Sequence, residues 1–299
     1  MLSRVKKIPA LKSLALLLAA SSCSTALAQV QLGNNMVIQQ DVQHTLLTKL
    51  SETLAASYVD KDTAAVLKRQ LREMSNQVSS NKQLSPDEFA EFITRELQKT
   101  SGDQHLRVDY SQEPLDIPFS EKVIADFQSD QERDLWRARN LGFEKVERLP
   151  FNIGYLQLSA FAPATEAKRM LAASFEFLKN TDSLIIDLRG NFGGFEYTDQ
   201  LFASYFLEEK THLFDMHWRN GNKIDQRWSQ LNVDGPKYGN KRPVYILTDK
   251  RTFSGGESFS YMMKHLGRAT VIGETTGGAA HAGEEIQLSK HYSAFRYDF

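Results

Sequence analysis

The strongest constraint on the fold is an alternation of apolar strands with amphipathic helices in the second half of the chain. "SLIIDL" (183–188) and "PVYILTD" (243–249) are short, nearly continuous apolar runs, and a glycine-containing loop follows each of them. Such runs are typical of strands buried on both faces of a sheet. "TEAKRMLAASFEFLKN" (165–180) instead carries apolar residues at helical spacing. The alternation predicts an α/β domain over residues 150–299, with sites at the carboxyl ends of its strands.

The preceding part of the chain predicts a small helical bundle over residues 29–110. "QHTLLTKLSETLAASYV" (43–59) and "LSPDEFAEFITREL" (84–97) each place apolar residues on one helical face. Ser85 and Glu88 have the spacing of a capping box, which marks the start of a helix. Residues 111–149 contain prolines and scattered charges without clear periodicity. We interpret them as a connector between the two domains.

Residues 1–28 have the pattern of a secretory signal peptide. A basic head precedes the apolar run Leu14–Ala20, and Ala26-Leu27-Ala28 is a small-x-small cleavage site. We therefore expect a secreted or periplasmic protein. An alternative is a lipoprotein anchored through Cys23. Since no comparable apolar run follows, we expect no integral membrane segment after the signal is removed.

Composition excludes several classes of partner. The chain has 36 basic and 37 acidic residues and no basic patch, so we expect no nucleic-acid binding. Its single cysteine lies in the signal, which excludes disulfides and cysteine metal ligands from the mature chain. His212 and His217 are not spaced like a helical zinc pair. We expect neither a metal nor another cofactor, and the sequence does not indicate an oligomeric state.

Ser254 permits two interpretations. It follows a predicted buried strand and precedes a helical pattern, in "RTFSGGESF" (251–259). A hydroxyl there would lie near unsatisfied backbone N–H groups at a helix N-terminus, which suits a nucleophile with an oxyanion site. Serine is also a preferred N-cap, and Glu257 completes the spacing of a capping box. The sequence around Ser254 alone does not decide whether this serine is a nucleophile or a helix cap.

"DLRGNFGGF" (187–195) forms a second loop after a predicted strand. Gly193 and Gly194 would allow backbone N–H groups to approach an anion. A glycine pair after a strand is also an ordinary tight turn. The loop lacks the lysine of a phosphate-binding P-loop.

The order of these segments resembles the tail-specific, or C-terminal processing, serine protease family. "DLRGNFGG" (187–194), "VYILTDKRTFSGGESF" (244–259) and "GRATVIGETTGG" (267–278) follow one another as that family's motifs do. The resemblance implies a fold like the crotonase and Clp protease superfamily, with stacked ββα units. It implies a polypeptide substrate and Ser254 as the nucleophile. It also implies an oxyanion hole formed by the N–H groups of Gly255 and of the Gly193–Gly194 loop.

The resemblance also indicates which group activates the serine. One branch of the family places a lysine after "GETTGG", where this chain has Ala279 and Ala280. The branch similar to the tricorn core and interphotoreceptor retinoid-binding protein instead has a histidine in a "D-x-H-L-R-V" segment. "GDQHLRV" (102–108) supplies His105, and an imidazole suits a general base at neutral pH. His281, in the glycine-rich loop, is a further candidate to line the substrate cleft.

The acid that supports the base is not identified by spacing. In the resembling branch it comes from further strands, whereas this chain stops at Phe299, so we expect an α/β domain that is incomplete at its C-terminal end. Glu274, Glu284 or Glu285 could substitute. We therefore expect a serine endopeptidase. The alternative is a catalytically weak or inactive module on the same fold that binds apolar ligands.

Overall fold

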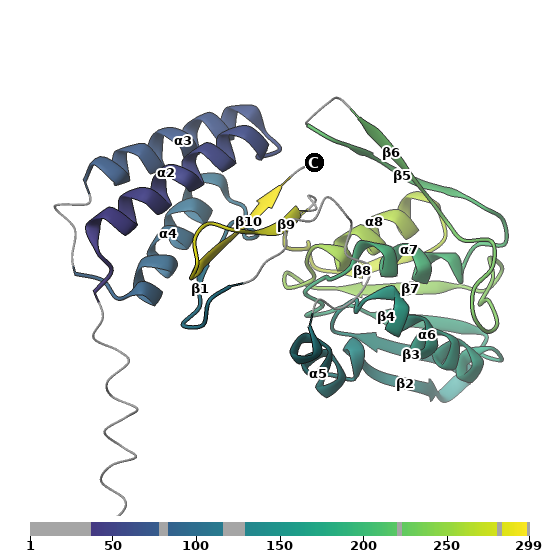
Figure 1. Cartoon of the computed structure of the whole chain (residues 1–299). Coiled ribbons are helices and arrows are strands. Elements are labelled where there is room, and N and C mark those ends of the chain that lie inside the picture. The colour runs from purple at the N-terminus through teal and green to yellow at the C-terminus, as the bar shows by residue number, and fades with distance from the viewer. Residues whose placement is uncertain (1–36, 78–82, 116–128, 220–222, 280–282, 298–299) are drawn as a thin grey trace, which may run out of the picture.

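The computed structural model describes residues 37–77, 83–115, 129–219, 223–279 and 283–297 (Figure 1). The predicted signal peptide with Cys23 lies outside these residues, as does His281. The described residues form two units. The N-terminal unit comprises residues 37–115 and 283–297, and the α/β unit comprises residues 129–279.

The N-terminal unit is built on the predicted helices. They are α2 (Gln40–Ser57), α3 (Lys61–Asn76) and α4 (Pro86–Ser101). The predicted capping box starts α4, because the Ser85 N–H donates to the Glu88 carboxylate at 2.8 Å and the Glu88 N–H donates to the Ser85 hydroxyl. Gly102 ends this helix in the left-handed region with φ 73°. The helices bury their leucine faces against one another.

A three-stranded antiparallel sheet completes the N-terminal unit. Its order is β1-β10-β9, from β1 (Val108–Tyr110), β10 (Tyr292–Tyr297) and β9 (Gly283–Gln287). Leu288, Tyr292 and Ala294 belong to the same apolar cluster as the helices. The predicted division placed all of residues 150–299 in the α/β domain, whereas β9 and β10 pack with the N-terminal helices. The pairing of strands about 180 residues apart leaves no local signal in the sequence.

The α/β unit has the predicted sheet core. Its strand order is β2-β3-β4-β7-β8. The strands are β2 (Phe143–Leu149), β3 (Ile153–Leu158), β4 (Ser183–Asp187), β7 (Val244–Thr248) and β8 (Thr270–Gly273). The last four run parallel, and β2 is antiparallel to β3. The mixed α/β class with N-terminal helices is therefore confirmed.

Helices and a ribbon complete this unit. The helices are α5 (Asp130–Ala138), α6 (Ala164–Leu178), α7 (Glu196–Ser204) and α8 (Gly255–His265), with short 3₁₀ turns at η2 (Asn140–Gly142) and η3 (Pro150–Asn152). The ribbon pairs β5 (His212–His217) with β6 (Ile224–Trp228). Helix α5 lies in the segment that the sequence predicted to be a connector.

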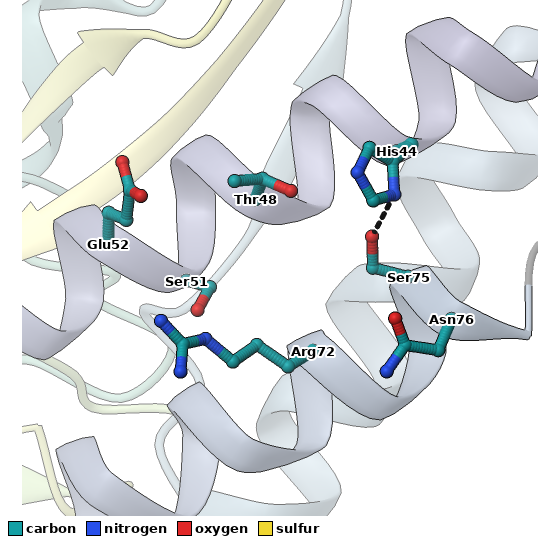
Figure 2. A pocket seen from close by; sticks show the side chains of 7 residues that line it. All are labelled: His44, Thr48, Ser51, Glu52, Arg72, Ser75 and Asn76. Atoms are coloured by element: carbon teal, nitrogen blue, oxygen red, sulfur yellow. Dashed lines mark hydrogen bonds between the residues drawn. The ribbon is translucent and has the colours of Figure 1, made fainter.

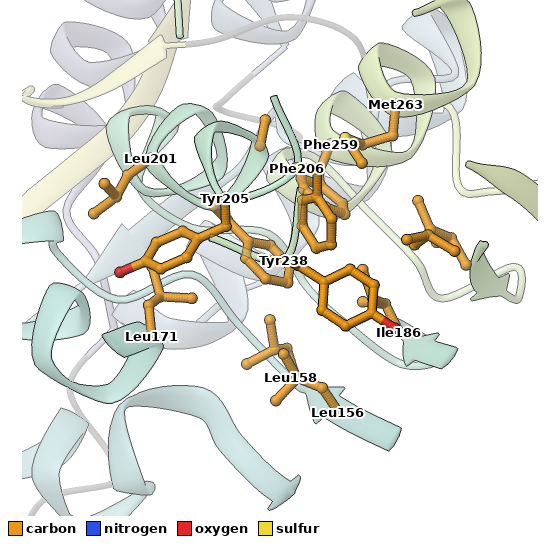
Figure 3. Close-up of a cluster of buried hydrophobic side chains, with 14 of the residues drawn as sticks. Leu156, Leu158, Leu171, Ile186, Leu201, Tyr205, Phe206, Tyr238, Phe259 and Met263 are labelled. Atoms are coloured by element: carbon orange, nitrogen blue, oxygen red, sulfur yellow. The ribbon is translucent and has the colours of Figure 1, made fainter. Parts of the chain in front are cut away.

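The core of the α/β unit is rich in stacked aromatic rings (Figure 3). Phe175 of α6 stacks on Tyr205 with ring centroids 4.2 Å apart, and Phe202 of α7 stacks on Phe259 of α8 at 4.5 Å. All four rings are fully buried. Because Phe259 lies on α8 five residues after Ser254, this packing fixes the helix whose N-cap is the predicted nucleophile.

Replacing a ring of this core tests how far it stabilises the unit. Phe175→Ala should lower the free energy of unfolding by about 3–5 kcal/mol, because it removes a fully buried ring and leaves a cavity. Phe177→Ala on the same helix is the matched control. Its ring is 59% exposed, so the change should stay within about 0.5 kcal/mol. Urea unfolding followed by circular dichroism measures both, and equal losses would contradict the assigned core.

Candidate active site

Ser254 has a backbone conformation that a helix cap does not need. It lies between β7 and α8 with φ 49° and ψ −118°, whereas N-cap residues are normally extended. A non-glycine residue in such a region costs about 1–3 kcal/mol and persists only where its surroundings enforce it. A serine on a sharp, strained turn from strand to helix is the geometry of a nucleophile elbow.

Glu257 holds this turn in place. Its carboxylate accepts the Ser254 N–H at 3.0 Å. The same carboxylate accepts the N–H groups of Gly278 and Ala279, both at 2.7 Å. The capping residue predicted for α8 therefore also binds the "GETTGG" loop (273–278) beside the serine.

The glycine loop 187–195 packs directly against the serine turn. A Cβ at Gly193 would lie 2.6 Å from the Ser254 Cβ, and one at Gly194 would lie 2.1 Å from the Phe161 carbonyl oxygen. Both glycines also have positive φ, 92° and 133°. Only glycine fits such positions, so the pair is required for the close approach of the two loops.

The N–H groups around Ser254 differ in what they contact. The Gly193 N–H donates to Asn191 Oδ1 at 2.9 Å, so it is already engaged. The N–H groups of Gly194 and Gly255 make no hydrogen bond to another described residue. A Cβ at Gly255 would lie 3.4 Å from the Gly194 nitrogen, which places the two residues side by side. Two neighbouring N–H donors beside a strained serine can bind a developing oxyanion.

Asp249 joins the two loops at the ends of β4 and β7. Its carboxylate accepts the N–H of Gly190 at 2.9 Å, the N–H of Arg251 at 3.0 Å and the Arg251 guanidinium at 2.9 Å. Burial acts to raise the pKa of Asp249, but these hydrogen bonds outweigh it and lower the pKa to about 2. The ionised carboxylate therefore helps to hold the glycine loop beside the serine turn.

His105 reaches this region from the N-terminal unit. It lies between α4 and β1 and is 7% exposed. Its ring centroid is 4.4 Å from that of Phe253, the residue directly before Ser254, and 5.4 Å from that of Phe295 on β10. The structure thus brings the predicted base against the turn that carries the predicted nucleophile.

Asp103 lies beside this imidazole, and the sequence analysis did not identify it. Its Oδ1 accepts the His105 N–H at 2.9 Å and lies 3.4 Å from His105 Nδ1. Both side chains are largely buried, at 8% and 11% exposure. The sequence feature that could have identified this acid is the aspartate two residues before the histidine in "GDQHLRV".

The predicted substitutes for this acid have other contacts. Glu274 accepts the Lys250 N–H, and Glu285 accepts the Ser293 hydroxyl. The side chain of Glu284 lies outside the described part of the chain.

Among the described residues, no three His, Cys, Asp or Glu side chains gather as metal ligands, and no helix is long and apolar enough to cross a membrane. A polar cavity of about 220 Å³ lies between α2 and α3, lined in part by His44, Arg72 and Ser75 (Figure 2). It contains none of the predicted site residues.

A strained serine at a helix start, flanked by backbone donors, has the arrangement that serine hydrolases use. Comparison with known protein families then identifies the family to which the chain belongs. Residues 152–298 match the model of peptidase family S41, and residues 34–134 match the N-terminal domain of peptidase S41 in eukaryotic IRBP. The chain belongs to peptidase family S41.

Individual relatives agree with this assignment. The carboxy-terminal processing protease CtpB of Bacillus subtilis is 28% identical over 137 residues, which cover 46% of this chain and 27% of CtpB. The match therefore spans about a quarter of that relative. A putative peptidase from Parabacteroides merdae superposes with a TM-score of 0.54 at 20% identity, covering 87% of this chain and 82% of its own. A CPAF mutant gives 0.59 at 11% identity, covering 86% and 89%. At these low sequence identities, the two superpositions show that the fold is shared and nothing more.

The role of Asp249 predicts how stability depends on pH. Because the folded-state pKa of about 2 lies below the ordinary 3.8, the carboxylate stabilises the fold above about pH 4. That contribution is lost as the pH falls towards about 2. In Asp249→Asn the free energy of unfolding should therefore fall less between these pH values than in the wild type. Urea unfolding at each pH measures it, with the same exchange at exposed Asp134 as control. Equal falls would contradict the assignment.

Proposed function

We propose that this chain is a serine endopeptidase with Ser254 as nucleophile and His105 as general base. The single observation that carries the proposal is the strained Ser254 turn, packed against the glycine loop and contacted by His105 through Phe253. A purely structural cap would need neither the positive φ nor the imidazole. Membership of a peptidase family supports the same reading.

The proposed reaction follows the general scheme of acyl transfer. His105 takes the hydroxyl proton while Ser254 Oγ bonds to the carbonyl carbon of the scissile peptide. The oxyanion that forms accepts hydrogen bonds from the N–H groups of Gly194 and Gly255. His105 then gives the proton to the leaving amine as the C–N bond breaks. A water molecule, activated by the same imidazole, hydrolyses the acyl-enzyme and restores the serine.

The loop donor in this proposal is Gly194 rather than Gly193. Gly193 supplies the close approach to Ser254, but its N–H is bonded to Asn191. Gly255 begins α8, so its N–H belongs to the positive end of the helix, where developing negative charge is favoured. The two donors come from different loops, and Asp249 fixes the separation between those loops.

Fluorophosphonate labelling tests the nucleophile and the base. Ser254→Ala should abolish covalent labelling, and His105→Ala should slow labelling and the hydrolysis of casein by about 10⁴-fold, because the hydroxyl loses its proton acceptor. Intact-protein mass spectrometry measures labelling, and peptide mapping of casein shows whether bonds inside the chain are cut. Ser258→Ala, one turn further along α8, is the matched control and should keep wild-type rates. A folded wild type that neither labels nor cleaves would refute the proposal.

We also propose that the chain is exported through residues 1–28. The support is the basic head, the apolar run and the small-residue cleavage site of that segment. Expression of the full chain in a bacterium with a periplasm should yield a mature protein that begins at Gln29. N-terminal sequencing of the periplasmic fraction measures this. A chain beginning at a lipid-modified Cys23 would instead support the lipoprotein alternative, and an uncleaved cytoplasmic chain would contradict export.

A further inference from the structure

A continuous set of contacts connects the α/β unit with the predicted base. Arg219 follows β5 in the ribbon of the α/β unit, which extends towards the N-terminal helices (Figure 1). Its guanidinium donates to the carbonyl oxygens of Tyr58 and Ala55, the latter at 3.0 Å. The Tyr58 hydroxyl donates to Asp103 Oδ2 at 3.2 Å. Asp103 in turn holds His105 through its other oxygen.

The Arg219 contact is favoured by the chemistry of a helix end. Ala55 and Tyr58 lie in the last turn and at the C-cap of α2, where carbonyl groups lack helical partners and carry partial negative charge. No basic residue lies in the last turn of α2 itself. The forked guanidinium of Arg219 supplies both hydrogen-bond donors and the positive charge from the other unit.

The Tyr58 contact fixes the carboxylate that faces the imidazole. Tyr58 is 5% exposed, and burial together with the Asp103 carboxylate raises the pKa of its phenol, so the phenol stays a hydrogen-bond donor. With Oδ2 accepting this hydroxyl, Asp103 keeps Oδ1 for the His105 backbone N–H, and the same oxygen lies 3.4 Å from Nδ1 as an electrostatic contact. A carboxylate beside Nδ1 favours the tautomer with the proton on Nδ1, which leaves Nε2 as the basic nitrogen.

We propose that Asp103, Tyr58 and Arg219 are positioning residues of the active site, and that Arg219 couples the orientation of His105 to the docking of the β5–β6 ribbon. The inference rests on the proposed function, since it assigns the groups that orient its base. It supplies the supporting acid from the N-terminal unit, two residues before the histidine. It also makes the activity depend on contact between the two units.

The kinetic test uses the full mature chain with the variants Asp103→Asn, Tyr58→Phe and Arg219→Ala. Asp103→Asn should lower kcat by about 10²- to 10⁴-fold with KM changed by less than about twofold, because the imidazole is misoriented while substrate contacts remain. Tyr58→Phe and Arg219→Ala should each lower kcat by about five- to tenfold, the scale of one or two net hydrogen bonds. Asp103→Glu and Arg219→Lys should each recover part of the loss.

Lys223→Ala is the matched control on the same ribbon. Its ammonium contacts Asp225 and lies over Trp218, both within the ribbon, so its loss should leave the kinetic constants at wild-type values. Hydrogen exchange gives a second readout that needs no catalysis. Amides of residues 54–60 should exchange at least about tenfold faster in Arg219→Ala than in Lys223→Ala, because the end of α2 loses its clamp.

The outcomes separate this inference from the function on which it rests. If the wild type does not label with fluorophosphonate, the proposed peptidase activity fails, and the positioning role fails with it. If the wild type labels, and Tyr58→Phe and Asp103→Asn fold and retain the wild-type kcat, the inference is wrong while the peptidase stands. If Asp103→Asn does not fold, Tyr58→Phe decides. Unchanged exchange in Arg219→Ala would remove the coupling between units.

Discussion

The close packing of Gly193 against Ser254 is the constraint on which the rest of the site depends. No side chain fits between these residues, so the two loops can meet only with glycine at 193 and with the serine backbone in a strained conformation. Asn191, Asp249 and Glu257 hold the loops in this arrangement through their hydrogen bonds to backbone N–H groups. Each of these polar side chains accepts a hydrogen bond from backbone N–H groups that would otherwise need water as a partner. The strain at one residue is thus supported by contacts from three segments.

The imidazole of His105 is held by residues from both units. The His105 ring stacks on Phe295 of β10 and meets the ring of Phe253 of the serine turn at a tilt of 40°. β10 carries Phe295 and pairs with β1, which begins three residues after the histidine. The site is therefore built where the beginning, middle and end of the described chain meet. Its geometry follows from the docking of two units, each with its own apolar cluster.

The parts that could be predicted from sequence are those with a local cause. Helix α4 was predicted from Ser85 and Glu88, and the buried strands from runs such as 183–188. The glycine loop was recognised because its residues share one short motif. The packing of β9 and β10 with the N-terminal helices leaves no local signal, because β1, which pairs with β10, lies about 180 residues earlier. Asp103 was missed because its distance from Nδ1 depends on how the turn after α4 folds.

The two interpretations of Ser254 prove to be compatible in physical terms. Glu257 performs the capping through its carboxylate, which binds the N–H of Ser254 itself, while the N–H of Glu257 donates to the Ser254 carbonyl oxygen at 2.9 Å. The backbone N–H groups of Ser254 and Glu257 are therefore both hydrogen-bonded within the turn. The N–H of Gly255 remains at the positive end of α8, beside that of Gly194. A capped helix and an oxyanion site can share one turn when a carboxylate three residues on supplies the cap.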